Sequence, residues 1–426
     1  MSLPAPTSAP AERTRSRPGA RELFEVALVH GAVGFGGGYS VLASLRAALV
    51  ERRRWLSERE FVNAATVAQM LPGGAAANAL AYAGLRFAGV RGALAAYGGF
   101  VLPGFLLTLA LAAAYVRWGA APDVEAVLGG FNAAVVGVVA ALTIQLVRTG
   151  VGRLWQMGVA AGALLMSLAG GASSGEVAGM GVGAGLLVDL GLKRARLMRL
   201  RSRRAAPSIA APVALPEDGT PLPTPRPDAD ETHLHAIAVG LGTAAGLHAF
   251  GLDAKLLELS LVFFRTGLGA YGGGFAVIPH LQAAVEGSGW LEPRQFADAV
   301  AIGKLTPGPV LLMATFIGYV VGGLPAALVA TGSVLAAPLL LVVSVGTFLD
   351  RARSRRPVRA ALRGLTPAVA GLMAAAALSL GRGLGGADEV GIAAAVALTV
   401  HRFPVNPAVM LALGGAVRLA LKAAGL

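Results

Sequence analysis

The chain has 426 residues, of which 55% are hydrophobic and only 14% charged, and it contains no cysteine. Soluble domains carry about 25% charged residues, so this composition indicates a membrane protein, and it excludes disulfides and thiolate metal sites. The formal net charge of +13 comes from arginine-rich loops beside apolar segments, which is typical of cytoplasmic loops and not of a nucleic-acid-binding surface.

Residues 1–21 are rich in Pro, Ala and Arg and lack the apolar core of a signal peptide, so they are predicted to form a disordered basic tail. The first unit, residues 22–192, follows this tail and is rich in apolar segments close to the length that crosses a bilayer. They lie near 24–50, 61–88, 93–117, 128–148, 154–170 and 174–191.

The second unit, residues 253–426, repeats the plan of the first. Its apolar segments lie near 256–285, 296–323, 325–349, 360–381, 387–401 and 405–421. When the glycine triplets at 36–38 and 272–274 are aligned, further identical residues pair in order: Phe61 with Phe296, Pro72 with Pro307, Gly73 with Gly308, Gly84 with Gly318, Pro103 with Pro338, and Gly137 with Gly371. Such an ordered series indicates an internal duplication.

A basic and Pro-rich segment, residues 193–233, separates the two units and is predicted to be a cytoplasmic linker. It is followed by a single apolar segment at 234–252. Because the apolar part of this segment has roughly the 17 residues that a span requires, we predict a connecting transmembrane helix, with a surface helix as the alternative.

Loop charge predicts that the two units have inverted topology. In the first unit, arginines at 52–54 follow the triplet segment, and the loop near 119–127 is acidic. In the second unit the loop after the triplet is nearly neutral, and arginines within 351–359 take the place of the acidic loop. Because Lys and Arg favour the cytoplasmic side, the units should lie upside down relative to each other, as in many transporters.

Glycine or proline interrupts the first two apolar segments of each unit, at 36–38, 72–74, 272–274 and 307–309. The pieces on either side are too short to cross a bilayer, so we predict re-entrant helical hairpins, with kinked spanning helices as the alternative. Irregular backbone at membrane depth persists only where protein or a wet cavity surrounds it. Free N–H groups at the start of each following half-helix would suit an anion.

Lys304 adds a positive charge to this predicted anion site, since a lysine at membrane depth is expensive and usually functional. Its repeat counterpart is the neutral Gln69. The structural alternatives are pairing of Lys304 with Asp298 and snorkelling to the interface. The candidates for proton coupling are Asp298, Glu258 and Glu22. The predicted substrate-binding residues are Gly36, Gly37, Gly38, Gln69, Pro72, Gly73, Gly74, Gly272, Gly273, Gly274, Lys304, Thr306, Pro307, Gly308 and Pro309.

The sequence contains no Ser-His-Asp arrangement, P-loop or HExxH motif. We therefore predict neither an enzyme nor an ATP-driven pump, with no catalytic residues, no metal site and no cofactor.

The motifs FGGGYSVL, LPGG, YGGGFAVIP and GKLTPGPVLLMATFIGYVVGGLP resemble the chromate ion transporter family in its long-chain, two-domain form. The resemblance covers nearly the whole chain outside the tail and the linker. In the second unit GWLEPRQF, TPGP and ATFIGY stand in family-like order and spacing. The chain departs from the family pattern at Gly38 and Gly74, where the family often has proline.

This resemblance implies an α-helical carrier in the bacterial inner membrane that exports chromate by alternating access, coupled to the proton gradient. The implied partners are a small oxyanion and the lipid bilayer, with a homodimer left open and no nucleic acid. The alternative within transport is uptake or exchange of sulfate or another small anion. The alternative from another class is a membrane-embedded scaffold or enzyme without transport.

Overall fold

The computed structural model describes residues 18–35, 38–170, 172–204, 253–352, 355–403 and 405–425. Within these ranges the regular structure is helical, without strands, and five helices are long and apolar enough to cross a membrane. The predicted all-α polytopic membrane fold is therefore confirmed.

The described helices of both units coincide with the predicted apolar segments. The first unit contains α1 (Ala20–Ala32), α2 (Gly38–Arg46), a π-helical turn η1 (Ala47–Arg52), α3 (Glu58–Met70), α4 (Ala75–Trp118), α5 (Pro122–Gly150), α6 (Leu154–Leu168) and α7 (Ser174–Arg204). The second contains α9 (Ala254–Leu268), η3 (Gly272–Val277), α10 (Ile278–Gly287), α11 (Pro293–Leu305), η4 (Val310–Leu312), α12 (Met313–Ala352), α13 (Arg356–Gly381), α14 (Ala387–Arg402) and α15 (Pro407–Ala423).

Two helices extend across predicted segment boundaries. α1 begins at Ala20, inside the segment predicted as a tail, and α7 continues through the basic run to Arg204, into the segment predicted as a linker. The tail up to residue 17, the linker from residue 205 onward and the predicted connecting helix at 234–252 lie outside the described residues.

α4 and α12 each contain a sharp turn at equivalent positions. The turn in α4 lies at Ala88 and Gly89, where the φ of Gly89 is 62°. The turn in α12 lies at Gly322 and Gly323, where the φ of Gly323 is 66°. Glycine adopts this left-handed backbone without steric cost. The two turns therefore divide each long helix into a short arm and a long arm in the same way.

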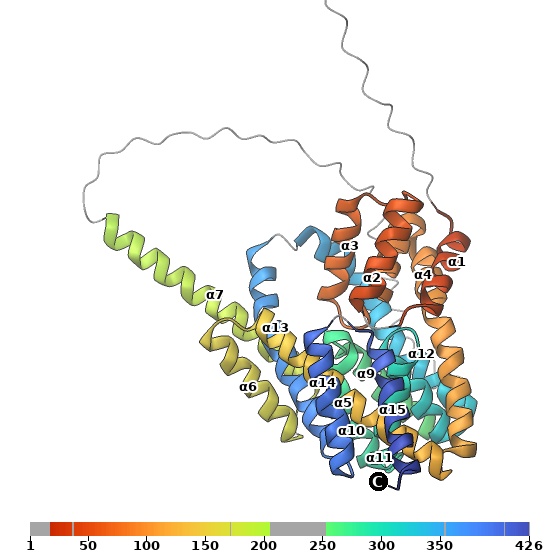
Figure 1. The fold of residues 1–426 in the computed structure, drawn as a ribbon. Coiled ribbons are helices and arrows are strands. Elements are labelled where there is room, and N and C mark those ends of the chain that lie inside the picture. The colour runs from red at the N-terminus through yellow and green to blue at the C-terminus, as the bar shows by residue number, and fades with distance from the viewer. Residues whose placement is uncertain are drawn as a thin grey trace, which may run out of the picture.

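The short helices of the two units lie toward different ends of the molecule. α1, α2 and α3 lie together at one end, and α10 and α11 lie toward the other (Figure 1). α1, α3 and α11 have 13 residues each. At 1.5 Å per residue they are about 20 Å long, which is less than the ~30 Å hydrocarbon core of a bilayer. Short helices grouped in this way are expected of hairpins that enter and leave on one face.

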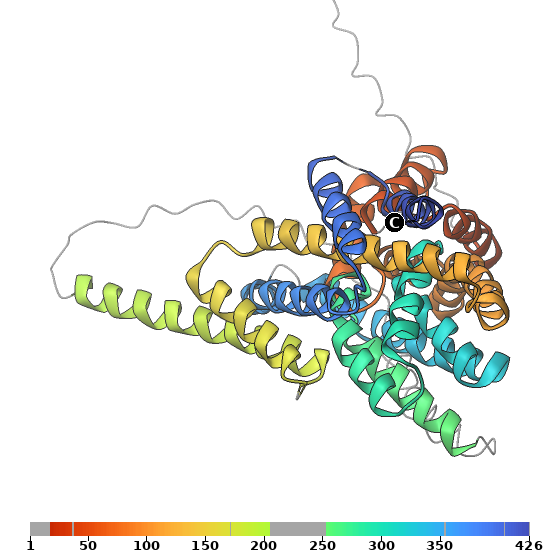
Figure 2. The ribbon, with the colours of Figure 1, turned by 60° about the horizontal axis from the view of Figure 1, so that its bottom comes forward.

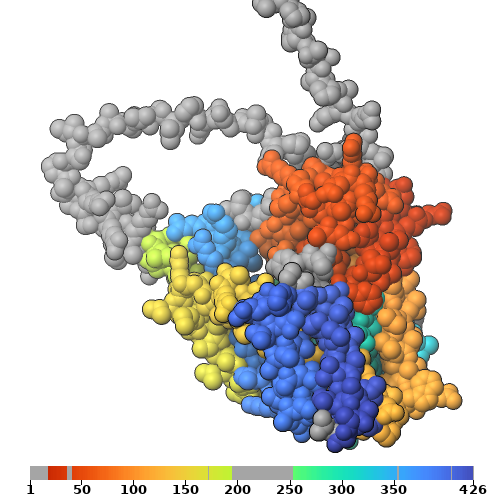
Figure 3. Space-filling model, in the orientation of Figure 1, coloured from red at the N-terminus to blue at the C-terminus, as the bar shows by residue number. Residues whose placement is uncertain are grey.

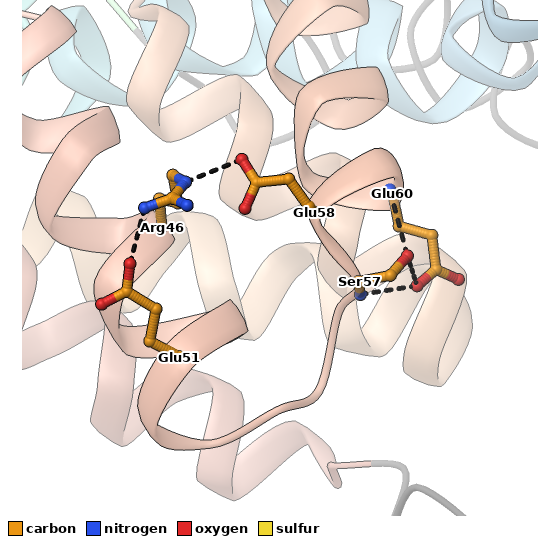
Figure 4. Close-up of polar contacts among 5 residues, drawn as sticks. All are labelled: Arg46, Glu51, Ser57, Glu58 and Glu60. Atoms are coloured by element: carbon orange, nitrogen blue, oxygen red, sulfur yellow. Dashed lines mark hydrogen bonds and ion pairs between the residues drawn. The ribbon is translucent and has the colours of Figure 1, made fainter. Parts of the chain in front are cut away.

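Arg46, at the end of α2, connects α2 to α3 (Figure 4). Its guanidinium group donates to the carboxylate of Glu51 at 2.6 Å and to that of Glu58 at 2.7 Å. The start of α3 carries a capping box, in which the Ser57 hydroxyl accepts from the N–H of Glu60 and the Glu60 carboxylate accepts from the N–H of Ser57. These contacts fix the two helices relative to each other at their polar ends.

The long helices exchange partners between the units. α5 packs against α14 and α15, whereas α13 packs against α6 and α7. Repeat counterparts allow the close approach: a Cβ atom at Gly137 would lie 2.4 Å from the carbonyl oxygen of Ala393, and one at Gly371 would lie 2.2 Å from that of Ala160. Each unit thus completes the helical packing of the other.

The exchange can be followed in the figures. In Figure 2, α7 runs beside α13 and extends beyond it. In Figure 3, the blue surface of α14 and α15 covers the face below the red and orange end formed by α1 to α3.

Gly84→Ala is expected to destabilise the protein by about 1–3 kcal/mol, the usual cost of overpacking. A Cβ atom at Gly84 would lie 2.3 Å from the carbonyl oxygen of Gly92, across the turn in α4. The measurement is the midpoint of thermal unfolding in detergent. Gly98→Ala on the same helix is the control, because no atom lies within 4 Å of a Cβ placed there. Equal midpoints for Gly84→Ala and the wild type would contradict the close packing at this turn.

Candidate functional site

Reciprocal backbone hydrogen bonds join the breaks of the two units. The N–H of Gly73 donates to the carbonyl of Ala270 at 2.8 Å, and the N–H of Gly308 donates to the carbonyl of Gly34 at 3.4 Å. Gly73 and Gly308 are repeat counterparts with φ values of 107° and 108°. The second break of each unit is therefore paired with the chain at the first break of the other unit.

Two helices begin where the second breaks touch each other. Gly74 is the N-cap of α4, and Pro309 is the N-cap of η4, which runs directly into α12. A Cβ atom at Gly74 would lie 3.0 Å from the Cβ of Pro309, so the two helix starts adjoin. Among the described residues, the N–H groups of Ala75 and Ala76 have no acceptor. These helix starts offer free donors and the positive ends of two helix dipoles.

Lys304 lies near the end of α11, five residues before Pro309, and is only 9% exposed. Its Nζ lies 4.9 Å from the centre of the Phe275 ring in η3. Gly274, which directly precedes Phe275, adjoins η4, because a Cβ atom at Gly274 would lie 3.5 Å from the Cβ of Val310. Within the described part of the chain, no carboxylate lies within ion-pairing distance of Nζ. The ring face stabilises the ammonium group, by about 2 kcal/mol at a desolvated site, but does not neutralise it.

Asp298, also on α11, is 2% exposed and has partners other than Lys304. Its Oδ2 accepts from the hydroxyl of Tyr115 on α4 at 3.0 Å, and its Oδ1 accepts from Nδ2 of Asn132 on α5 at 2.7 Å. Pairing of Lys304 with Asp298, one of the alternatives from the sequence, is therefore absent from the described structure. The burial of Lys304 also argues against snorkelling.

Further contacts attach the same face of α11 to the first unit. Arg294 forms an ion pair with Glu125 of α5 at 2.7 Å. After α11 ends, the Thr306 hydroxyl lies 3.1 Å from that of Thr108 on α4. Arg294, Asp298 and Thr306 are spaced four and eight residues apart, so they line one side of this segment. The segment that carries Lys304 is thus held along its length by α4 and α5.

The remaining residues of the predicted site divide into several groups. Pro72, Pro307 and Gly274 are buried at the breaks, whereas Gly272 and Gly273 are exposed. Instead of starting a half-helix directly after Gly274, the chain forms η3, and α10 begins at Ile278. Gly38 begins α2, while Gly36 and Gly37 lie outside the described residues.

Three other candidates, Gln69, Glu22 and Glu258, have exposed side chains. Gln69, the counterpart of Lys304, is exposed. Glu22 is exposed at the start of α1, where its carboxylate accepts from the N–H of Gly19. Glu258 is exposed on α9 and accepts from the Ser288 hydroxyl at 3.4 Å. These positions favour a capping role for Glu22 and do not place either glutamate at the breaks.

The sequence did not identify the polar side chains that form hydrogen bonds to the breaks and to the α11 segment. Asn78 is fully buried, and its Nδ2 donates to the carbonyl of Pro72 at 2.8 Å, which fixes the break before α4. Tyr115, Asn132 and Thr108 hold the α11 segment as described above. Asn78 could have been noticed as a lone polar residue within an alanine-rich run.

A duplicated all-α membrane fold, in which broken helices of the two units meet each other, is the architecture of a polytopic membrane transporter. Sequence comparison agrees. Residues 21–188 and 257–419 each match the chromate transporter family, one match in each unit. The chain therefore belongs to the chromate transporter family, as its motifs predicted.

Individual relatives cover most of the chain. A probable chromate transport protein of Synechococcus elongatus is 31% identical over 85% of this chain and 84% of its own. A chromate transport protein of Cupriavidus metallidurans is 30% identical over 85% and 82%. An uncharacterized transporter of Methanocaldococcus jannaschii is 25% identical over 85% and 84%. No solved structure matches the chain.

Tyr115→Phe is expected to cost about 1.5–3 kcal/mol of stability, because it removes a hydrogen bond to a buried carboxylate. The measurement is thermal unfolding in detergent. Tyr97→Phe, on the same helix, is the matched control: the Tyr97 hydroxyl is buried without a partner in the described structure, so its removal should leave stability unchanged or raise it. Equal losses in the two variants would contradict the importance of the contact with Asp298.

Proposed function

We propose that this chain exports chromate across the bacterial inner membrane and acts as a transporter, not an enzyme. The observation that carries the proposal is Lys304, a buried cation without an anionic partner among the described residues, beside the adjoining starts of α4 and η4. A tetrahedral dianion would neutralise Lys304 and accept from the free N–H groups. The names of two relatives supply the identity of the dianion.

Alternating access between inverted units is the mechanism we propose. It is supported by the reversed arginine pattern of the loops and by the placement of α1–α3 and of α10–α11 toward different ends (Figure 1). The reciprocal bonds of Gly73 and Gly308 put a break of each unit beside a break of the other. Rocking of one unit against the other would then expose the site to one face at a time.

Asp298 is the residue that we propose for coupling to protons. It is a buried carboxylate on the same helix as Lys304, six residues away, and its partners belong to the first unit. Protonation would weaken its acceptance of the hydrogen bonds from Tyr115 and Asn132. Binding of a proton would thereby loosen the attachment of the segment that carries Lys304, which couples the proton to movement of the site.

Sulfate is the main competing substrate, because a lysine and backbone N–H groups recognise charge and shape that all tetrahedral dianions share. Proteoliposomes with labelled chromate or labelled sulfate, each with the other anion unlabelled as competitor, and a pH gradient of either direction test this point. We expect chromate movement to follow the imposed gradient and to exceed sulfate movement. Preferred transport of sulfate, or rates independent of the gradient, would overturn the respective part of the proposal.

Lys304→Gln, which introduces the residue of the repeat counterpart, and Lys304→Ala are expected to lower the initial rate of chromate export at least about tenfold. Removing one member of a buried charge pair costs 2 kcal/mol or more. The control is Lys255→Gln, an exposed lysine at the start of α9. All variants are compared at equal amounts in the membrane. Wild-type chromate export by Lys304→Ala would remove Lys304 from the site.

A further inference from the structure

A cavity of about 360 Å³ with several polar side chains in its lining lies between the ends of α6, α10, α11 and α13. Its volume is sufficient for a small hydrated anion. The cavity is separate from the paired breaks, and its lining includes His280, Gln282 and Glu286 of α10 and Ser379 and Arg382 of α13. Polar side chains from two facing helices thus line part of the cavity, beside apolar residues such as Leu168 and Leu380.

Hydrogen bonds link the α10 and α13 walls of the cavity. The Ser379 hydroxyl donates to Oε1 of Gln282 at 2.6 Å, and Nε2 of Gln282 donates to Glu286 at 2.8 Å. The carboxylate of Glu286 is thereby engaged in the last turn of α10. The guanidinium group of Arg382 is exposed at the end of α13 and has no carboxylate partner in the described structure.

Two segments that line the cavity continue toward Lys304. On α11, Pro293 and Ala297 line the cavity. Lys304 follows Ala297 by seven residues, which places it on the same face and about 10 Å farther along the axis. On the α10 side, His280 lines the cavity near the start of the helix, just after η3, which contains the Phe275 ring that contacts Lys304.

The cavity is at the end of α13 opposite the basic loop. Arg355, Arg356 and Arg359 are at the start of α13, and Ser379 to Gly383 at its other end line the cavity. About 23 residues of helix separate the two ends, or roughly 35 Å, which is enough to cross the ~30 Å hydrocarbon core of a bilayer. By the positive-inside rule the cavity faces away from the cytoplasm.

From these observations we propose that the cavity between α6, α10, α11 and α13 is the extracytoplasmic vestibule through which the oxyanion passes between Lys304 and the outside, with Arg382 as the cation at its mouth. This inference rests on the proposed function and adds the route and the residues of one access pathway. If the anion takes this route, a bulky group attached to a side chain in the cavity should block transport while Lys304 itself is unmodified.

Ala283→Cys tests the vestibule, because Ala283 lines the cavity and the chain has no other thiol. Ser288→Cys, in the exposed loop after α10 and outside the cavity lining, is the matched control. A membrane-impermeant methanethiosulfonate with a sulfonate group is added to intact cells. We expect both thiols to be labelled from outside, but only labelled Ala283→Cys to lose transport, by about tenfold, since its path is narrowed. The reference is wild-type protein treated with the same reagent.

Three results would overturn the vestibule. The first is full labelling of Ala283→Cys with wild-type transport. The second is labelling of Ala283→Cys only in inside-out vesicles. The third is a labelling rate that sulfate does not slow at Ala283→Cys, measured without any transport step; sulfate is used because chromate oxidises thiols. Failure of the proposed function is distinguishable, since it appears as preferred transport of sulfate by untreated wild-type protein in proteoliposomes.

Removing a positive or a negative charge at the mouth of the cavity should change the KM for the anion in opposite directions. Arg382→Gln should raise the KM for the anion measured from outside by about two- to fivefold, and Glu286→Gln should lower it by a similar factor, because each changes the local field that steers an anion. Maximal rates should stay unchanged, since neither residue contacts the site at Lys304. Equal KM values in wild type and both variants would remove these residues from the pathway.

Discussion

The reciprocal hydrogen bonds between the breaks are the constraint on which the rest of the structure depends. A broken helix at membrane depth exposes backbone groups that lipid cannot pair. Here the N–H of Gly73 is paired by the chain at Ala270, and the N–H of Gly308 by the chain at Gly34. Each unit therefore supplies backbone partners that the other needs, and neither could satisfy its breaks in the same way alone.

The long helices of each unit likewise pack against helices of the other unit. Apolar helices gain little from association in lipid unless their backbones approach closely, which favours small residues at the contacts. Gly137 against α14 and Gly371 against α6 provide this approach at equivalent places in the two units. The units are consequently interleaved, and in the proposed transport cycle movement of one against the other would act through the breaks and the contacts of α11.

The helices, the duplication and the positions of the breaks could be predicted, because long apolar runs and repeated glycine and proline motifs carry those signals. The partners of the site could not. Tyr115 lies near the end of an apolar segment, where tyrosine usually marks the membrane interface, so nothing local points to Asp298. The exposure of Gln69 was equally hidden, since a helix of 13 residues does not reveal which of its faces the other unit will cover.

The charges of the candidate site are asymmetric although the backbone around it is duplicated. The paired breaks have matching φ values and matching contacts in both units, yet Lys304 and Asp298 have the neutral counterparts Gln69 and Asn63. Two symmetric half-sites with a lysine each would bring two cations together at low dielectric, where their repulsion is large. One lysine beside two helix starts instead creates a single site of moderate positive charge. In the proposed transport cycle such a site would bind an anion and still release it, which every cycle requires.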